Sequence, residues 1–170
     1  MMIRLATYAE IDIIETLTEE AKVLMLEDQN PQWDHRYPLK THFERDIEAN
    51  SMYVIDEDKT IKGFIVIDQK APDWYNSIQW PSDISNAYVI HRLVASPKYK
   101  GSAQRMMDFA ENLARQYDVD ILLTDTFSLN ERAQKLFQKN GFIMTGEMTS
   151  NEFPFDKGEP FYAYYKNLNE

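Results

Sequence analysis

Hydrophobic residues recur three or four positions apart in four stretches of the chain, which is the spacing of one face of an α-helix. The pattern predicts helices over residues 10–27, 39–47, 106–117 and 131–140. The first helix opens on a T-x-x-E capping box, Thr7 with Glu10, and the fourth on an S-x-x-E box, Ser128 with Glu131. Gly141 then ends the fourth helix.

Short apolar or alternating runs predict strands around these helices. They cover residues 3–6, 52–55, 61–67, 86–95, 120–124, 142–148 and 161–166. The second and third strands read as a hairpin, whereas residues 71–85 read as irregular. The resulting order, β-α-α-β-β-β-α-β-α-β-β, predicts one mixed α/β domain over residues 1–170, with central strands flanked by helices.

The composition excludes several classes of protein. Hydrophobic residues make up 44% of the 170 residues, which is enough for a packed core. The absence of cysteine excludes disulfides, thiolate metal sites and a cysteine nucleophile. The three histidines fall in different elements without metal-ligand spacing, so no metal is expected. No signal peptide and no apolar run of roughly 20 residues is seen, so we expect a cytoplasmic protein without a membrane partner.

The net charge of −10 gives no general reason to bind nucleic acid, and its distribution is uneven. Residues 1–60 hold 14 acidic and 6 basic side chains, which amounts to −8 of the total. Such a region favours a basic binding partner, although solvated acidic helices give the same pattern. Residues 87–103 contain no acidic side chain but include His91, Arg92, Lys98 and Lys100.

This basic window joins the end of a buried strand to the start of a helix. The first N–H groups of a helix point outward, and the helix dipole adds positive potential. Gly101 and Ala103 would let phosphates approach the backbone, and two lysines would add charge. The window therefore indicates an anion site, although an ordinary strand-to-helix turn is the alternative. It has neither the P-loop spacing nor the G-x-G-x-x-G fingerprint, which leaves coenzyme A as a natural ligand.

Two motifs carry a resemblance to the GCN5-related N-acetyltransferases (GNAT family). Their main motif, Q/R-x-x-G-x-G/A, is similar to Lys98-Tyr99-Lys100-Gly101-Ser102-Ala103, in which lysine replaces the usual Gln or Arg. Their second motif, N-x-x-A-x-x-x-Y/F-x-x-x-G-F/Y, matches residues 130–142 throughout. The element order also agrees over almost the whole chain.

The resemblance implies acetyl-CoA as the cofactor and assigns residues to it by position. Backbone groups near Leu93, Val94 and Ala95 would pair with the pantetheine arm, in the splay between two parallel strands. The pyrophosphate would be held by Lys98, Tyr99, Lys100, Gly101, Ser102, Ala103 and Gln104. Asn130, Ala133 and Phe137 would lie along the cofactor, and for Ala133 and Phe137 core packing is a compatible role.

The proton-transfer groups are less well defined. Family members often place a glutamate on the central strand, but residues 86–95 contain no carboxylate, so His91 is the candidate general base. A hydrogen-bonded core histidine is the alternative for His91, and Asp125 is a second candidate, with a strand-end cap as its alternative. Many relatives have a tyrosine as general acid at the position of Phe137, so that role is vacant here or filled by Tyr88, Tyr99 or water.

We therefore expect an N-acetyltransferase that moves an acetyl group to a primary amine, of a small molecule or a peptide, by direct attack in a ternary complex. Trp33, Tyr37 and Trp80 are the candidate acceptor-binding residues, as pocket walls or as local mini-cores. The alternatives are a non-catalytic acyl-CoA-binding or regulatory module on the same fold, or a purely structural domain. A homodimer through an edge strand stays open.

Overall fold

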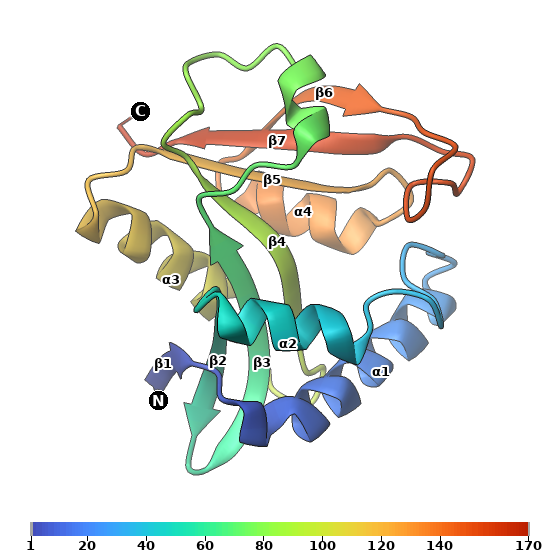
Figure 1. The fold of residues 1–170 in the computed structure, drawn as a ribbon, viewed down its shortest axis with the longest axis vertical. Helices are drawn as coiled ribbons and strands as arrows, with labels where there is room; N and C mark the ends of the chain where they lie inside the picture. Colours follow the sequence, from blue (N-terminus) through green and yellow to red (C-terminus); the bar gives the residue numbers. More distant parts are fainter. Residues whose placement is uncertain (1, 170) are drawn as a thin grey trace. The chain divides into compact units, whose positions relative to one another are not determined.

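The structure is a computed structural model, and it describes residues 2–169 (Figure 1). Within these residues the chain forms two compact units, residues 2–67 with 91–109 (unit 1) and residues 68–90 with 110–169 (unit 2). The strands are β1 (Met2–Leu5), β2 (Met52–Glu57), β3 (Thr60–Asp68), β4 (Tyr88–Ala95), β5 (Ile121–Phe127), β6 (Ile143–Met148) and β7 (Phe161–Asn167). The helices are α1 (Ile11–Glu27), α2 (Lys40–Glu48), α3 (Ser102–Gln116) and α4 (Glu131–Lys139), with short 3-10 turns η1 (Tyr8–Glu10) and η2 (Asp73–Ser77).

The strands follow the order β1-β2-β3-β4-β5-β7-β6 in a mixed sheet. In unit 1, β1, β2 and β3 are antiparallel, and Ser96 at the end of β4 donates its N–H to the Lys62 carbonyl of β3 at 3.0 Å. In unit 2, β4 runs parallel to β5 with a register that joins residues 88–90 to residues 122–124, and β7 and β6 are antiparallel. The predicted mixed α/β fold and its element order are confirmed.

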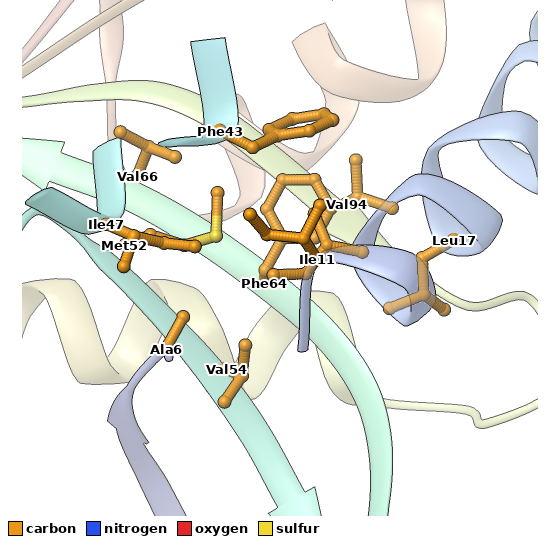
Figure 2. Close-up of a cluster of buried hydrophobic side chains, with 11 residues drawn as sticks. Ala6, Ile11, Leu17, Phe43, Ile47, Met52, Val54, Phe64, Val66 and Val94 are labelled. Carbon is orange, nitrogen blue, oxygen red and sulfur yellow. The ribbon is translucent and has the colours of Figure 1, made fainter. Parts of the chain in front are cut away.

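The core of unit 1 lies between one face of the strands and the α1–α2 pair (Figure 2). Alternate strand residues and residues at helical spacing supply it, as the two periodicities predict. Its members include Ile11, Ile14 and Leu17 of α1, Phe43 and Ile47 of α2, Met52 and Val54 of β2, Phe64 and Val66 of β3, and Val94 of β4. Arg92 lies two residues before Val94, so its side chain leaves β4 on this same face.

The core of unit 2 is rich in aromatic side chains. Tyr75 of η2 is fully buried with Val89 of β4, Leu123 of β5 and Tyr165 of β7, and Trp74 and Trp80 pack against them. A single 3-10 turn thus supplies a main core residue of this unit, in a segment that the sequence predicts to be irregular.

Three local predictions are wrong in detail. Ser128 does not cap α4: Asn130 does, by accepting a hydrogen bond from the Ala133 N–H at 3.0 Å, and the buried Ser128 hydroxyl has no hydrogen-bond partner. Asp125 is not at a strand end, because β5 continues to Phe127 and pairs with β7 along its length. Tyr117 lies outside α3 and is 60% exposed, so it is not part of the apolar face of that helix.

Candidate functional site

The turn between β4 and α3, residues 96–101, is a compact backbone structure in unit 1. The Tyr99 N–H donates to the Ser96 carbonyl at 3.2 Å, and the Ser102 hydroxyl donates to the Tyr99 carbonyl at 3.1 Å. Gly101 has a φ of +85°, which lies in the left-handed region that glycine adopts without strain. Gly101 is the one glycine among residues 87–103, and it lies where the chain turns into α3.

The start of α3 suits an anion chemically. Helix geometry provides no acceptor within the helix for the N–H groups of Ser102 and Ala103, and the dipole adds positive potential there. No atom lies within 4 Å of the position that a Cβ on Gly101 would take, so a ligand can approach the backbone at that point. Lys98 and Lys100 are exposed beside it. The residues that the sequence assigns to the pyrophosphate thus fit a phosphate group.

One acidic and one basic side chain from other elements of unit 1 reach this turn. Glu20 of α1 lies 3.5 Å from the Lys98 ammonium and accepts a hydrogen bond from the Ser96 hydroxyl at 3.4 Å. Lys62 of β3 lies over the ring of Tyr99, with its ammonium 4.5 Å from the ring centroid. Other elements therefore change the charge around the turn, since α1 contributes a carboxylate 76 residues from Ser96 and β3 contributes a cation.

Glycine allows β4 to lie unusually close to β3 beside this turn. A Cβ on Gly63 would lie 2.6 Å from the Val94 carbonyl oxygen and 3.3 Å from the Ala95 Cα, both of which are backbone atoms. Val94 is buried in the core, while Leu93 and Ala95 are half-buried. The stretch predicted to pair with pantetheine thus lies against β3 at a point where a side chain larger than that of glycine does not fit.

His91 and Arg92 follow one another on β4 and therefore point to opposite faces of the strand. Arg92 points toward α2, where its guanidinium contacts both carboxylate oxygens of Asp46 at 2.6 Å. Its other terminal nitrogen donates to the Tyr37 hydroxyl at 2.6 Å. Burial disfavours the charge, but Tyr37 and Asp46 outweigh it and raise the pKa of Arg92. His91, the candidate base, is half-buried on the other face.

Asp125, the second candidate base, lies in the middle of β5 in unit 2 and is half-buried. It accepts a hydrogen bond of 2.6 Å from the hydroxyl of Tyr75. Burial and the nearby Asp125 carboxylate raise the pKa of Tyr75 well above its ordinary value, so this phenol keeps its proton. The strand-end cap that sequence reasoning favoured is replaced by a phenol–carboxylate pair.

The second motif, residues 130–142, spans the whole of α4 in unit 2 together with its N-cap and the turn that follows it. The Asn130 side-chain oxygen caps the helix, Ala133 is half-buried, and Phe137 is buried. The Phe137 ring centroid lies 5.9 Å from that of Phe142 and 5.4 Å from that of Tyr164. These contacts give Asn130 and Phe137 structural roles, and the cofactor roles that the resemblance implies stay predictions.

The three candidate acceptor-binding residues lie in two different units. Trp33 packs against the core of unit 1, and its ring meets that of Tyr37 edge to face at 6.4 Å. Trp80, in unit 2, donates its indole N–H to the Tyr75 carbonyl at 2.9 Å and packs against Tyr75. All three rings make contacts within their own unit, as the mini-core alternative predicts, and none of these contacts excludes a substrate on the remaining ring surface.

Sequence reasoning missed two polar partners, Asp46 and Tyr75. Asp46 faces inward at the spacing of Phe43 and Ile47, and a carboxylate on the apolar face of a helix is a signal for a buried cation. Tyr75 carried no comparable signal, because it lies in an aromatic and irregular segment with several equivalent rings.

Two searches of residues 2–169 had negative outcomes. No helix there is long and apolar enough to cross a membrane. No three His, Asp or Glu side chains of the described chain gather in a group that could hold a metal ion.

Comparison with known proteins gives consistent matches. The sequence model of the acetyltransferase (GNAT) family matches residues 17–142. A Staphylococcus aureus Mu50 protein assigned as an acetyltransferase is 42% identical, with a TM-score of 0.77 and 99% of each chain covered. A GNAT-family acetyltransferase of Streptococcus agalactiae shares the fold at 24% identity, with a TM-score of 0.82 over 98% of this chain and 94% of that chain.

YncA of Salmonella typhimurium, whose structure holds its cofactor acetyl-CoA, shares the fold at 17% identity, with a TM-score of 0.68 over 100% of this chain and 95% of that one. No curated protein matches the chain.

Proposed function

The chain belongs to the acetyltransferase (GNAT) family, and on that premise we propose that it transfers an acetyl group from acetyl-CoA to a primary amine. The amine belongs to a small molecule or a peptide, and it attacks directly in a ternary complex. Bound acetyl-CoA supplies an activated acetyl group: a C–N bond forms, the C–S bond breaks, the sulfur leaves as a thiol, and the amine loses a proton to a base.

The observation that carries this proposal is the turn at the start of α3. Ser102 and Ala103 offer backbone N–H groups, Gly101 leaves an open approach to them, and two exposed lysines flank the turn. This donor set matches the pyrophosphate of a coenzyme A molecule. The stretch 93–95 of β4 precedes it directly, and in the proposed complex its backbone pairs with the pantetheine arm.

The proton acceptor is His91, a water relay or Asp125, and the pH dependence of the rate distinguishes the two side chains. An unperturbed histidine titrates near pH 6.5, whereas an ordinary aspartate is already ionised well below that. We expect the acidic limb of the kcat/KM profile to disappear in His91→Gln if His91 is the base. If Asp125→Asn instead lowers the rate by about 100-fold or more, while His91→Gln keeps the limb, Asp125 is the base.

The proton donor to the leaving sulfur is Tyr88, Tyr99 or water, since Phe137 has no proton to give. Burial, and to a lesser degree Tyr117, raises the pKa of Tyr88, so this residue holds its proton at neutral pH. Replacing each tyrosine by phenylalanine and comparing the maximal rates of the two variants identifies the donor, or leaves water in that role.

A non-catalytic acyl-CoA-binding or regulatory module is the second candidate function. The buried Phe137 ring favours it, because it fills the place of the family's usual tyrosine and packs with the rings of Phe142 and Tyr164. This alternative predicts tight binding of acetyl-CoA without release of thiol on any amine.

The decisive experiment combines calorimetry with acetyl-CoA and a thiol-release assay on a panel of amines. The panel holds a polyamine, a peptide with a free N-terminal amine and a peptide with a lysine side chain. Binding with turnover on one of them supports the transferase, and binding without turnover on any of them supports the alternative. Absence of acetyl-CoA binding contradicts both and leaves a structural domain.

Charge reversal tests the phosphate assignment within the same experiment. We expect the double substitution Lys98→Glu with Lys100→Glu to weaken acetyl-CoA binding at least tenfold at low salt, because each charge would face the pyrophosphate. Lys70→Glu is the matched control, since Lys70 is an exposed lysine outside the turn. Equal affinities of the two variants would remove the assignment of the turn.

The acceptor side is proposed from charge and aromatic side chains. The acidic first third of the chain and the rings of Trp33 and Trp80 favour a cationic acceptor. The roles of Asn130 and Ala133 beside the cofactor, a homodimer and a cytoplasmic location also remain predictions.

A further inference from the structure

The side chain of Arg92 joins three segments of unit 1. It leaves β4, makes a two-point contact with Asp46 of α2, and donates a third hydrogen bond to Tyr37 in the loop before α2. The exposed fraction of both charged side chains is only 12%, so solvent screens this pair little. A guanidinium suits this role because its rigid fork holds two partners in fixed directions, which a lysine ammonium does not.

The loop that Tyr37 belongs to is closed on itself. Asp34 and Tyr37 exchange two backbone hydrogen bonds of 3.2 and 3.3 Å, and the Asp34 carboxylate accepts from the Arg36 N–H at 2.8 Å. Tyr37 also meets the ring of His42 on α2 edge to face at 4.8 Å. The loop is therefore a small preformed turn, and the Tyr37 hydroxyl is its polar contact with β4 through Arg92.

Arg92 directly precedes Leu93, the first of the three residues whose backbone faces pantetheine in the proposed complex. One strand residue spans about 3.3 Å, so the anchor of the loop lies one residue from the proposed cofactor stretch. A buried ion pair stabilises a fold little more than apolar packing of the same shape does. Its fixed geometry, by contrast, sets where the loop lies relative to β4.

We propose that Arg92 is a positioning residue, which through Asp46 and the Tyr37 hydroxyl fixes the loop of residues 33–38 as one wall of the acceptor site. The inference rests on the proposed acetyl transfer and adds to it the residue that places the acceptor. It also changes the role of Tyr37. The ring is predicted to contact the acceptor, whereas here the Tyr37 hydroxyl holds the loop in position. Misplacement of a reactant by about 1 Å lowers rates strongly, so a residue that positions the loop affects the rate of acetyl transfer without touching the reacting atoms.

The first test uses Tyr37→Phe, which removes one hydroxyl and keeps the ring. Hydrogen exchange followed by mass spectrometry, on the full chain without ligand, should show amides of residues 31–39 exchanging at least fivefold faster, with other segments unchanged. Tyr8→Phe is the control, since Tyr8 is an exposed tyrosine of the same unit (55%). Unchanged exchange in this segment, or an equal increase throughout the chain, overturns the positioning role.

The second test separates acceptor from cofactor. With the panel amine that the unaltered protein acetylates, Tyr37→Phe should raise the KM for that amine about fivefold, while the dissociation constant of acetyl-CoA changes less than twofold. Arg92→Lys, which keeps the charge beside Asp46 but loses the fork, should behave like Tyr37→Phe. A KM for the amine that stays within twofold in both variants overturns the inference, as does a normal KM in Arg92→Lys alone.

The proposed function and the inference fail in different ways. If the unaltered protein binds no acetyl-CoA, the proposed function fails, and the inference fails with it. If it binds acetyl-CoA without turnover on any panel amine, the transferase is lost and no acceptor site remains for the loop to line, so the inference is overturned as well. If the unaltered protein turns over and the two variants match it, only the inference is overturned.

Discussion

Each of the two units contains a cluster in which an aspartate and a tyrosine hydroxyl are joined by hydrogen bonds, and the two clusters are arranged differently. In unit 1 the guanidinium of Arg92 stands between Asp46 and Tyr37, so the phenol oxygen accepts a hydrogen bond. In unit 2 the hydroxyl of Tyr75 donates directly to Asp125. The first cluster balances its charge with a permanent cation and suits holding segments together. The second cluster contains a phenol that donates a hydrogen bond to a carboxylate and keeps its proton, because burial and Asp125 raise its pKa well above the ordinary value.

The largest expected difference between the two clusters is in stability. Asp46→Ala leaves the Arg92 charge buried without its partner, so we expect the free energy of unfolding to fall by about 3–5 kcal/mol. Asp125→Ala removes the acceptor of the neutral Tyr75 phenol and should cost about 1–3 kcal/mol. Urea titration of both variants measures the two losses. The combined substitution of Arg92→Met with Asp46→Leu should recover most of the first loss, and equal losses for the two single variants would break the comparison.

A smaller effect is expected from the hydroxyl in unit 2. Tyr75→Phe removes a hydrogen bond to a carboxylate, and because Asp125 is only half-buried we expect a loss near the lower end of the usual range, about 1.5 kcal/mol. Tyr117→Phe is the control, since Tyr117 is 60% exposed and its change should stay within about 0.5 kcal/mol. If the two variants unfold at the same urea concentration, the Tyr75–Asp125 bond contributes nothing to stability.

The sequence predicts the order of helices and strands, but it does not predict the side-chain pairs of the two clusters. The element order follows from local periodicity, and the structure reproduces it because apolar spacing is a property of each segment alone. The pairing of Arg92 with Asp46 joins residues 46 positions apart, and no local pattern states which carboxylate a buried arginine meets. The same holds for Glu20 of α1, which pairs with Lys98 in the turn before α3 although no local pattern joins the two residues.

Local competition explains another part of what the sequence leaves undecided. Ser128 and Asn130 are both good helix caps and lie two residues apart, so the pattern permits either. The structure uses Asn130, and the Ser128 backbone carbonyl instead accepts from the Gln134 side chain at 2.8 Å. Tyr75 illustrates a different limit, because burial of an aromatic residue in a 3-10 turn has no periodic signature.

At alkaline pH the free energy of unfolding should depend on the Tyr75 cluster. The folded pKa of Tyr75 is raised above the ordinary value of 10, first by burial and then by Asp125, so above pH 10 the folded chain binds more protons than the unfolded chain. Stability from this group is complete below pH 10 and is lost as the pH rises toward the folded pKa, by at most about 1.4 kcal/mol per pH unit. Unfolding of the unaltered protein and of Tyr75→Phe between pH 8 and 11 gives the difference. Parallel curves would remove Tyr75 as the source.

Acidic pH should instead lower the free energy of unfolding through His42 in unit 1, and this is the smallest of the expected changes. Burial, followed by the charges of Arg92 and Arg45, lowers the folded pKa of His42 below 6.5, and its Nδ1 accepts a hydrogen bond from the Leu39 N–H at 2.8 Å, which requires the neutral ring. Below pH 6.5 the unfolded chain therefore binds more protons, so this contribution is complete above pH 6.5 and is lost as the pH falls through the folded pKa.

His42→Ala should lack that acidic loss, while Tyr75→Phe should keep it, and a urea series between pH 5 and 8 measures both. The expected loss is a fraction of a kcal/mol, since His42 is only half-buried and solvent screens its charge. Because the His42 ring packs on Tyr37, the same acidic range should speed hydrogen exchange in residues 31–39 of the unaltered protein. Faster hydrogen exchange around Tyr75 in the acidic range, with no change in residues 31–39, would contradict the assignment of the acid-sensitive contact to His42.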